Sequence, residues 1–153
     1  MHGNSLSAFF ATPLGVTCYA IFFIAVWYVA LSLISILSGW HALSERFKQE
    51  TAPYGEMRTA GPFFYSIYMR FWCHYSSVVR LTAASDGLYL SVMLPFRIGH
   101  PPLRITWNEI QLRRTKWFLG TYIVLTLGNE EMIPMRISQR MARNLGILDR
   151  VSA

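Results

Sequence analysis

Charge is missing from the first 44 residues of this chain. The first Asp, Glu, Lys or Arg is Glu45, so all 14 basic and all 8 acidic residues lie at or after that position. Charged residues make up 14% of the chain, against about 25% in a typical soluble domain. Hydrophobic residues reach 53%. This composition argues against an ordinary soluble protein and indicates a membrane-associated N-terminal part followed by a charged domain.

Cysteine and lysine are also scarce. The two cysteines, Cys18 and Cys73, fall in parts of the chain that could not easily meet, which excludes a disulfide framework. Lysine supplies 2 of the 14 basic residues and arginine 12, for a net charge of +6. This charge suits a domain that faces an anionic surface. Nucleic acid would attract the same charge, but membrane tethering makes it the weaker interpretation.

One uninterrupted apolar run, LGVTCYAIFFIAVWYVALSLISIL, extends from Leu14 to Leu37. As a helix it would be roughly 36 Å long, enough to cross a hydrocarbon core of about 30 Å. A cleavable signal peptide is the alternative. It requires a basic start and a small-residue cleavage site, whereas residues 1–13 contain no Lys or Arg and the run is followed by Gly39-Trp40-His41. The sequence therefore predicts a membrane anchor.

Basic residues follow this helix closely, and none precedes it. Arg46, Lys48 and Arg58 place the C-terminal side in the cytoplasm by the positive-inside rule. We expect Trp40 to be an aromatic anchor at the membrane interface. The predicted divisions are an extracytoplasmic N-terminus at 1–13, a transmembrane helix at 14–38, a juxtamembrane connector at 39–61 and a cytoplasmic β-rich domain at 62–153.

Small side chains recur every seven residues along the predicted helix, at Cys18, Ala25, Ser32 and Gly39. Such a stripe lets another helix approach closely. It therefore allows a homodimer or docking on a partner membrane protein, which would make the chain an accessory subunit of a larger complex. Small residues are common in membrane helices, so the spacing could also be coincidental.

Short strands are predicted after residue 62. Two alternating runs flank the turn Ala84-Ser85-Asp86-Gly87 and predict a hairpin. A change of parity near Asn108-Glu109 predicts a bulge or bend. Residues 63–74 fit either a strand or an interfacial segment. A turn at 128–131 and a final helix at 139–148, capped by Ser138, complete the pattern. The residues expected in the core are Leu88, Leu90, Trp107, Ile123, Leu125 and Leu145.

This order of elements predicts an α+β protein: an N-terminal transmembrane helix, then a small antiparallel β domain with a C-terminal helix. Five or six antiparallel strands closed by one helix is the order found in pleckstrin-homology-like domains. Agreement in element order is an analogy of fold and carries no function with it.

Three segments carry a resemblance to a family of small, uncharacterised bacterial proteins with a single membrane anchor. They read GLYLS at 87–91, FRIGHPPL at 96–103, and ITW at 105–107 followed by Glu109-Ile110. The family usually has Ile-Pro-Trp in the last segment, so Thr106 departs from its pattern. The resemblance covers residues 75–112, about a quarter of the chain. It implies a bacterial inner-membrane protein and transfers no catalytic or binding residue.

Residues that could carry chemistry are isolated from one another. Cys73 and His74 are neighbours, and neighbours on a strand point to opposite faces, so we expect a packed cysteine and no nucleophile–base pair. The four histidines lack the paired spacing of metal ligands, and no phosphate-binding loop or Ser nucleophile motif is present. We expect no cofactor, no metal and no enzyme activity, and a hydrolase is the least supported class.

The best functional candidate is a basic cluster at Arg113, Arg114 and Lys116, next to Trp117. Positive charge beside an aromatic side chain favours the headgroup layer of a membrane. We therefore expect a non-catalytic module that binds lipid headgroups or a partner protein at the cytoplasmic face. Strand alternation is the competing consideration, because we expect it to divide the cluster, with Arg113 and Lys116 on one face and Arg114 on the other. Arg140 and Arg143 are expected to form the solvated face of the last helix.

Overall fold

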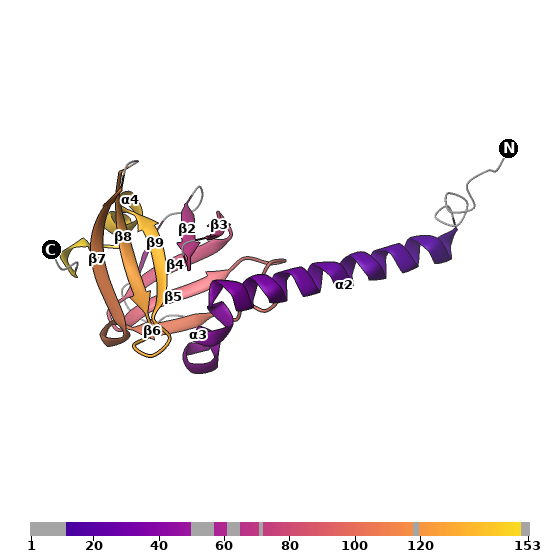
Figure 1. Ribbon diagram of the computed structural model, residues 1–153, viewed down its shortest axis with the longest axis horizontal. Helices are drawn as coiled ribbons and strands as arrows, with labels where there is room; N and C mark the ends of the chain where they lie inside the picture. Colours follow the sequence, from indigo (N-terminus) through magenta and orange to yellow (C-terminus); the bar gives the residue numbers. More distant parts are fainter. Residues whose placement is uncertain (1–11, 50–56, 61–64, 71, 118–119, 151–153) are drawn as a thin grey trace.

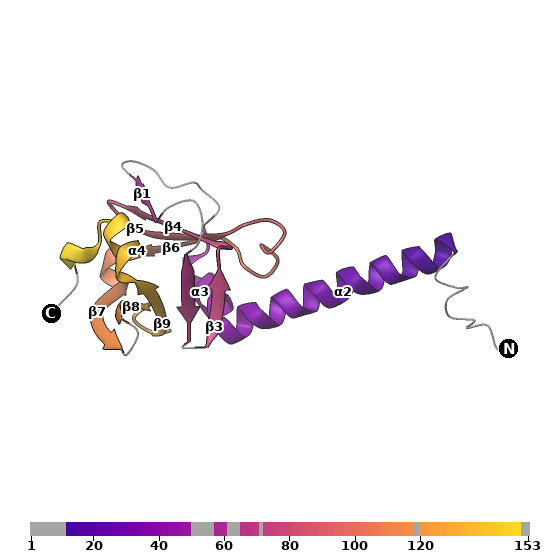
Figure 2. The same ribbon diagram turned by 90° about the horizontal axis from the view of Figure 1, so that it is seen from above.

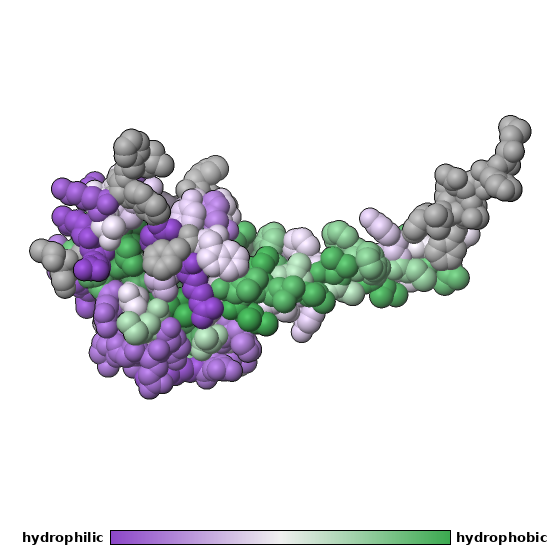
Figure 3. Space-filling model, in the orientation of Figure 1, coloured by the Kyte–Doolittle hydropathy of each residue, from purple (hydrophilic) through white to green (hydrophobic). Residues whose placement is uncertain are grey.

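A long helix projects from a small β domain in the computed structural model, which describes residues 12–49, 57–60, 65–70, 72–117 and 120–150 (Figure 1). The helix, α2 (Pro13–Ser38), is long and apolar enough to cross a membrane, a criterion that a signal sequence near the N-terminus also meets. Apolar side chains cover it, whereas the visible surface of the domain is largely hydrophilic (Figure 3). The predicted extracytoplasmic segment lies outside the described residues, except for Thr12 and Pro13.

Local signals explain where α2 begins and ends. The Thr12 side chain accepts a hydrogen bond from the Gly15 amide at 3.1 Å, and Pro13 occupies the first turn, where its missing N–H costs nothing. The helix ends at Gly39, whose φ of 84° is left-handed. A Cβ there would lie 2.7 Å from Ile133 Cδ1, so glycine is required. The chain then turns into α3 (Trp40–Phe47).

The β domain contains two antiparallel sheets (Figures 1 and 2). The four-stranded sheet has the order β1-β4-β5-β6, and the five-stranded sheet has the order β3-β2-β9-β8-β7. Their strands are β1 (Met57–Thr59), β2 (Ser66–Met69), β3 (Cys73–Ser76), β4 (Val79–Ala84), β5 (Gly87–Val92), β6 (Leu103–Thr106), β7 (Ile110–Trp117), β8 (Gly120–Leu127) and β9 (Ile133–Ser138). The α+β class is confirmed.

Several predicted boundaries agree with the structure. The hairpin is β4–β5, and the expected bend is the short 3₁₀ helix η1 (Trp107–Glu109). Ser138 caps the last helix, α4 (Gln139–Asn144), by accepting from the Met141 amide at 3.2 Å. This helix ends four residues before the predicted 148, and the 3₁₀ helix η2 (Leu148–Arg150) follows.

The ambiguous segment 63–74 forms a hairpin from two short strands, β2 and β3. Ile67 and Met69 point into the core, whereas Ser66 is exposed, as strand alternation requires. Residues 63, 64 and 71 of the predicted segment lie outside the described residues. The described part of this segment is therefore a pair of β-strands, which decides between the two alternatives that the sequence left open.

The core lies between the two sheets and includes five of the six side chains predicted to be buried. Trp107 is the exception, because it is half-buried and packs against the core from one edge. Buried branched residues cover the inner face of the five-stranded sheet in strict alternation, as Ile123, Leu125 and Leu127 do in β8. This alternation identifies the inner face of each strand.

Packing of the domain reaches upstream of residue 62. Trp40 and Leu43 in α3 are fully buried in the core, and β1 pairs with β4. Trp40 is therefore not the interfacial anchor that the sequence suggested: its ring is enclosed by protein. Arg46, also in α3, forms ion pairs at 2.8 Å with Glu109 and at 3.5 Å with Glu130. Part of the predicted connector thus belongs to the folded body.

Candidate functional site

The C-terminal turns of α2 are built into the domain. Ser35 and Ser38 are buried, and the Ser35 hydroxyl donates a hydrogen bond to the carbonyl of Gly99 in the loop between β5 and β6. A Cβ at Gly99 would lie 3.4 Å from Ser32 Cα. Two members of the predicted small-residue stripe, Ser32 and Gly39, therefore face the chain's own domain, while Cys18 and Ala25 are exposed.

A buried polar network joins this helix end to the sheets. The Tyr75 hydroxyl lies 2.8 Å from Ser38 Oγ and 3.0 Å from His100 Nε2. His100 Nδ1 lies 2.9 Å from the Ile98 carbonyl, which only accepts, so Nδ1 carries a proton. The Trp40 indole donates to the Pro101 carbonyl at 2.9 Å. The segment 96–103, which carries part of the family resemblance, thus forms one side of this helix–domain junction.

Burial governs ionisation in the junction. His100 is 1% exposed, and desolvation lowers its pKa below the usual value, with its backbone hydrogen bond acting weakly against this. The imidazole is therefore neutral near pH 7, with its proton on Nδ1. Burial raises the pKa of Tyr75 to about 12, with the Ser38 hydrogen bond opposing the rise. Both groups are uncharged, and the junction is an uncharged structural joint.

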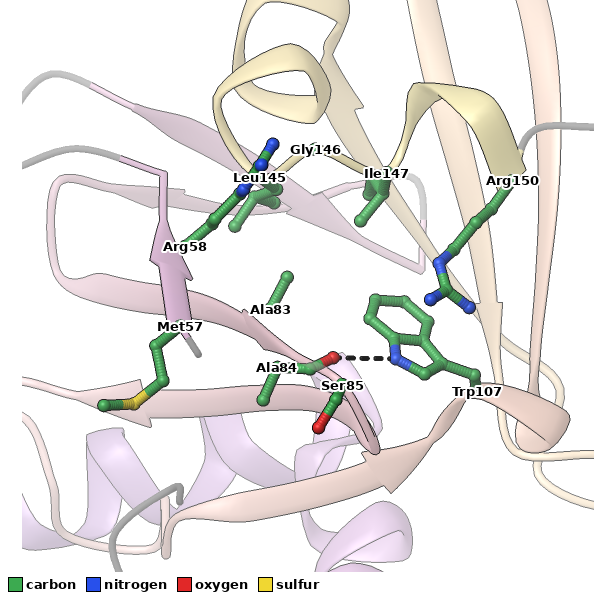
Figure 4. A pocket seen from close by; sticks show the side chains of 10 residues that line it. All are labelled: Met57, Arg58, Ala83, Ala84, Ser85, Trp107, Leu145, Gly146, Ile147 and Arg150. Atoms are coloured by element: carbon green, nitrogen blue, oxygen red, sulfur yellow. Dashed lines mark hydrogen bonds between the residues drawn. The ribbon is translucent and has the colours of Figure 1, made fainter. Parts of the chain in front are cut away.

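A pocket of about 380 Å³ lies where β1 and the end of β4 face the segment that follows α4 (Figure 4). The Trp107 indole forms one wall and is held by a hydrogen bond from Nε1 to the Ala84 carbonyl at 2.9 Å. Two arginines and a hydroxyl add polar groups to an otherwise apolar lining. The lining residues are Met57, Arg58, Ala83, Ala84, Ser85, Trp107, Leu145, Gly146, Ile147 and Arg150.

The two pocket arginines have room to bind an anion. The Arg150 guanidinium lies over the Trp107 ring, 4.6 Å from its centroid, and Arg58 passes beside Gly146, where a Cβ would lie 2.6 Å from Nη1. Within the part of the chain that the structure describes, neither arginine pairs with a carboxylate. A guanidinium binds carboxylate or phosphate through paired N–H donors, so the pocket is suited to an anionic group.

The predicted basic cluster lies on β7, an edge strand of the five-stranded sheet. Arg113, Arg114 and Lys116 are all exposed. Arg114 pairs with Ile123 and Lys116 with Thr121, whereas Arg113 pairs with Val124. Alternation therefore brings Arg114 and Lys116 to one face and sends Arg113 to the other. The Trp117 backbone pairs with Gly120, but its side chain lies outside the described part of the structure.

The other sequence candidates occupy structural positions. Cys73 is buried and its pKa is raised by desolvation, with Arg70 acting in the opposite direction, so the thiolate is disfavoured. His74 is exposed on the opposite face and stacks on Tyr68 with ring centroids 4.5 Å apart. Among the described residues, no group of three His, Cys, Asp or Glu side chains could hold a metal ion.

Glu130 and Glu131 differ in exposure, whereas Arg140 and Arg143 are both exposed. Glu130 and Glu131 lie in the turn between β8 and β9, but only Glu130 is solvated, with 82% of its side chain exposed. The Glu131 side chain is 14% exposed and lies 3.9 Å from Arg46. Arg140 and Arg143 are exposed on α4, as expected for a polar helix face.

Comparison of the chain with protein-family models, with curated proteins and with solved structures finds no match. Functional inference therefore depends on the geometry of the chain itself. Sequence reasoning missed the pocket because its residues come from four separate segments, each unremarkable alone. The one usable signal was Trp107, which was assigned to the core although the hydrophobic parity changes directly after it.

Proposed function

We propose that this chain is a membrane-anchored, non-catalytic binding module whose pocket binds an acidic segment of a partner protein. The observation that carries the proposal is the pair Arg58 and Arg150, which line one pocket without a carboxylate partner in the described structure. An arginine stacked on an indole keeps its in-plane N–H donors free for a carboxylate. The apolar lining would hold the body of the segment.

The position of the basic surface favours a partner protein over lipid headgroups. Strand β7 and helix η2 lie at the end of the domain away from α2 in both views (Figures 1 and 2). Headgroup contact by Arg113, Arg114 or Lys116 would require the domain to fold back towards the bilayer. The buried junction around Ser35, Ser38 and Trp40 opposes that motion. The same charges would instead attract an acidic partner from the solvent.

An anchor is favoured over a signal peptide because the last turns of α2 are buried against the domain. Cleavage near Gly39 would remove Ser35 and Ser38, and the Tyr75 hydroxyl would lose Ser38 Oγ, the acceptor of its hydrogen bond. We further propose a bacterial inner-membrane location, with the N-terminus outside and the domain in the cytoplasm, from Arg46, Lys48 and Arg58 after the helix. The two antiparallel sheets and C-terminal helix support a pleckstrin-homology-like domain.

Topology is tested by fusing to Ala153 a reporter that is active only in the periplasm. We expect no activity when the fusion is expressed in bacteria, and activity when the same reporter is fused at Met1. Strong activity of the C-terminal fusion would reverse the orientation. A cleaved, soluble fusion would identify α2 as a signal sequence.

Binding is tested in living cells with the full chain carrying a photo-reactive amino acid at Met57, on the rim of the pocket. We expect a specific cross-linked protein whose yield falls at least tenfold in Arg58→Gln/Arg150→Gln. Arg80→Gln is the matched control, because Arg80 is exposed on β4 and does not line the pocket. Equal loss in the control, or undiminished cross-linking in the double variant, would contradict the proposed site.

A further inference from the structure

The free length of α2 is shorter than a bilayer. Residues 16–26 are exposed, and Trp27 is the first side chain after them to become partly buried. Residues 13–26 form about 21 Å of helix, whereas the hydrocarbon core is about 30 Å thick. If the hydrocarbon begins at Pro13, it extends about 9 Å beyond that stretch, and tilting the helix extends it further. Whatever packs beside Trp27 and Leu31 therefore lies within the hydrocarbon.

The loop between β5 and β6 lies at the depth of Trp27 and Leu31. It extends along α2 in both views (Figures 1 and 2). The Phe96 and Trp27 ring centroids are 5.4 Å apart, and Ser35 binds the Gly99 carbonyl. The exposed side chains at the start of the loop are apolar: Leu94 is 77% exposed and Met93 is 45% exposed. An exposed leucine beside a transmembrane helix is a lipid-facing position.

A groove of about 400 Å³ lies between α2 and the domain at the same level. Trp72, which is 62% exposed, contributes to it from the turn between β2 and β3. Apolar and aromatic side chains dominate the lining, and water in such a groove would have few partners. The lining residues are Trp27, Leu31, Ile34, Trp72, Cys73, His74, Tyr75, Ser76, Val78, Val92, Phe96 and His100.

The backbone of the loop is suited to a place within lipid. Three amides at 93–100 donate to carbonyls of the chain itself, at 2.9 Å from Met93 to Val78, at 2.9 Å from Phe96 to Met93, and at 3.0 Å from His100 to Arg97. Backbone groups in hydrocarbon require such partners. The side chain of Arg70 lies beside Gly39 at the end of α2, a level at which a long basic side chain reaches the headgroups.

We propose that the side chains of Met93, Leu94, Phe96 and Trp72 are inserted in the hydrocarbon of the cytoplasmic leaflet beside α2, with the exposed side chain of Arg97 extending to the headgroups. Lipid acyl chains fill the groove between α2 and the domain. The proposal rests on α2 being the membrane anchor, but not on the pocket at the other end of the domain. The groove opens along the surface of the same helix that crosses the bilayer, so lipid is its immediate neighbour. A second copy of the chain and a partner helix are the competing occupants.

The test measures the collision of spin labels with O₂, which concentrates in lipid, and with a water-soluble nickel chelate. The full chain, with Cys18 and Cys73 replaced by alanine, is reconstituted in phosphatidylcholine–phosphatidylglycerol vesicles and labelled at Leu94. Position 94 tolerates a label because its side chain is mostly exposed. Labels at Ile24 in the free part of α2 and at Asn129 in the β8–β9 turn are the lipid and water references.

We expect the label at position 94 to match the label at position 24: strong O₂ collision and at least a fivefold lower collision rate with nickel than at position 129. If position 94 matches position 129 while position 24 remains in lipid, the insertion is wrong and the anchor stands. If positions 94 and 24 are both in water, the anchor itself fails. Protection from both reagents at position 94 means that protein covers the loop, which overturns lipid as its occupant.

Discussion

The two ends of the β domain handle polar and apolar groups in opposite ways. At the junction with α2, hydroxyl, imidazole and indole groups are buried and hydrogen-bonded, while large apolar side chains such as Leu94 and Trp72 are exposed. At the pocket end, the apolar side chains line the interior, and two arginines without an ionic partner among the described residues lie at the rim. This difference is what the two proposals require: an apolar surface where hydrocarbon is proposed to lie, and basic side chains where an anion is proposed to bind.

The largest expected effect comes from breaking the junction at Trp40. Its ring is fully buried against Tyr75 and His100, so Trp40→Ala should cost about 3–5 kcal/mol of unfolding free energy. Denaturant unfolding of the full chain in mild detergent measures this loss. Trp72→Ala is the matched control, because most of that side chain is exposed in the same region. Similar losses in the two variants would contradict the assigned packing.

A smaller loss is expected when one hydroxyl is removed from the polar network. Tyr75→Phe removes the hydroxyl that donates to Ser38 Oγ and lies 3.0 Å from His100 Nε2, at a cost of about 1–3 kcal/mol. Tyr65→Phe removes a hydroxyl that bonds Asn144 at an exposed site and should cost less than about 1 kcal/mol. Chemical denaturation of both variants makes the comparison, and equal costs would show that burial adds nothing to this network.

The junction should also make stability depend on pH. His100 has a lowered pKa in the folded chain because it is desolvated, and its neighbour Tyr75 stays uncharged in this range. The unfolded chain takes up a proton below about pH 6.5, whereas folded His100 does so only at lower pH. Stability therefore falls as the pH decreases from about 6.5 towards the folded pKa, by at most about 1.4 kcal/mol per pH unit.

The measurement for this prediction is the difference between the wild-type chain and His100→Asn in unfolding free energy from pH 7.5 to 5. Contributions from all other titrating groups are common to both proteins and cancel in this difference. The stability advantage of the wild type should shrink on acidification. A constant difference across the range would mean that His100 does not titrate differently on unfolding.

The smallest effect on stability is expected at the pocket. Arg150 is exposed and stacks on Trp107 without an ion pair in the described structure, so Arg150→Gln should change the unfolding free energy by less than about 1 kcal/mol. The melting temperature in detergent measures this. A loss as large as that for Tyr75→Phe would make Arg150 a structural residue and weaken the contrast between the two ends.

Much of the fold could be predicted from periodicity and turn residues. The apolar run gave α2 to within one residue at each end, and alternation in Leu88 and Leu90 identified a buried strand. Periodicity could not place Trp40, because its burial depends on contacts with Tyr75 and Pro101, which are distant in sequence. Three-residue β1 carries too little pattern to be recognised alone.

The candidate site was less accessible to sequence reasoning. The cluster at Arg113, Arg114 and Lys116 was visible as a run of charge, and the expected division between two faces is present. The predicted grouping was wrong, because residues two apart share a face of a strand, so Lys116 lies with Arg114 and not with Arg113. The distance between this cluster and α2 depends on the order in which the strands pair within the sheets. Local sequence patterns do not determine that order. Arg58 and Arg150 lie 92 positions apart in the chain. They line one pocket because the chain at η2 folds back beside β1.

The single left-handed residue between α2 and α3 has a mechanical consequence. Gly39 is the only residue between the two helices; the last turns of α2 are buried against the domain and α3 is packed in its core, so the connection is short and rigid. A transmembrane helix changes its tilt to match the thickness of the bilayer around it. If α2 spans the membrane as proposed, such a change would rotate the whole domain with it, and the basic end furthest from the helix would move the most.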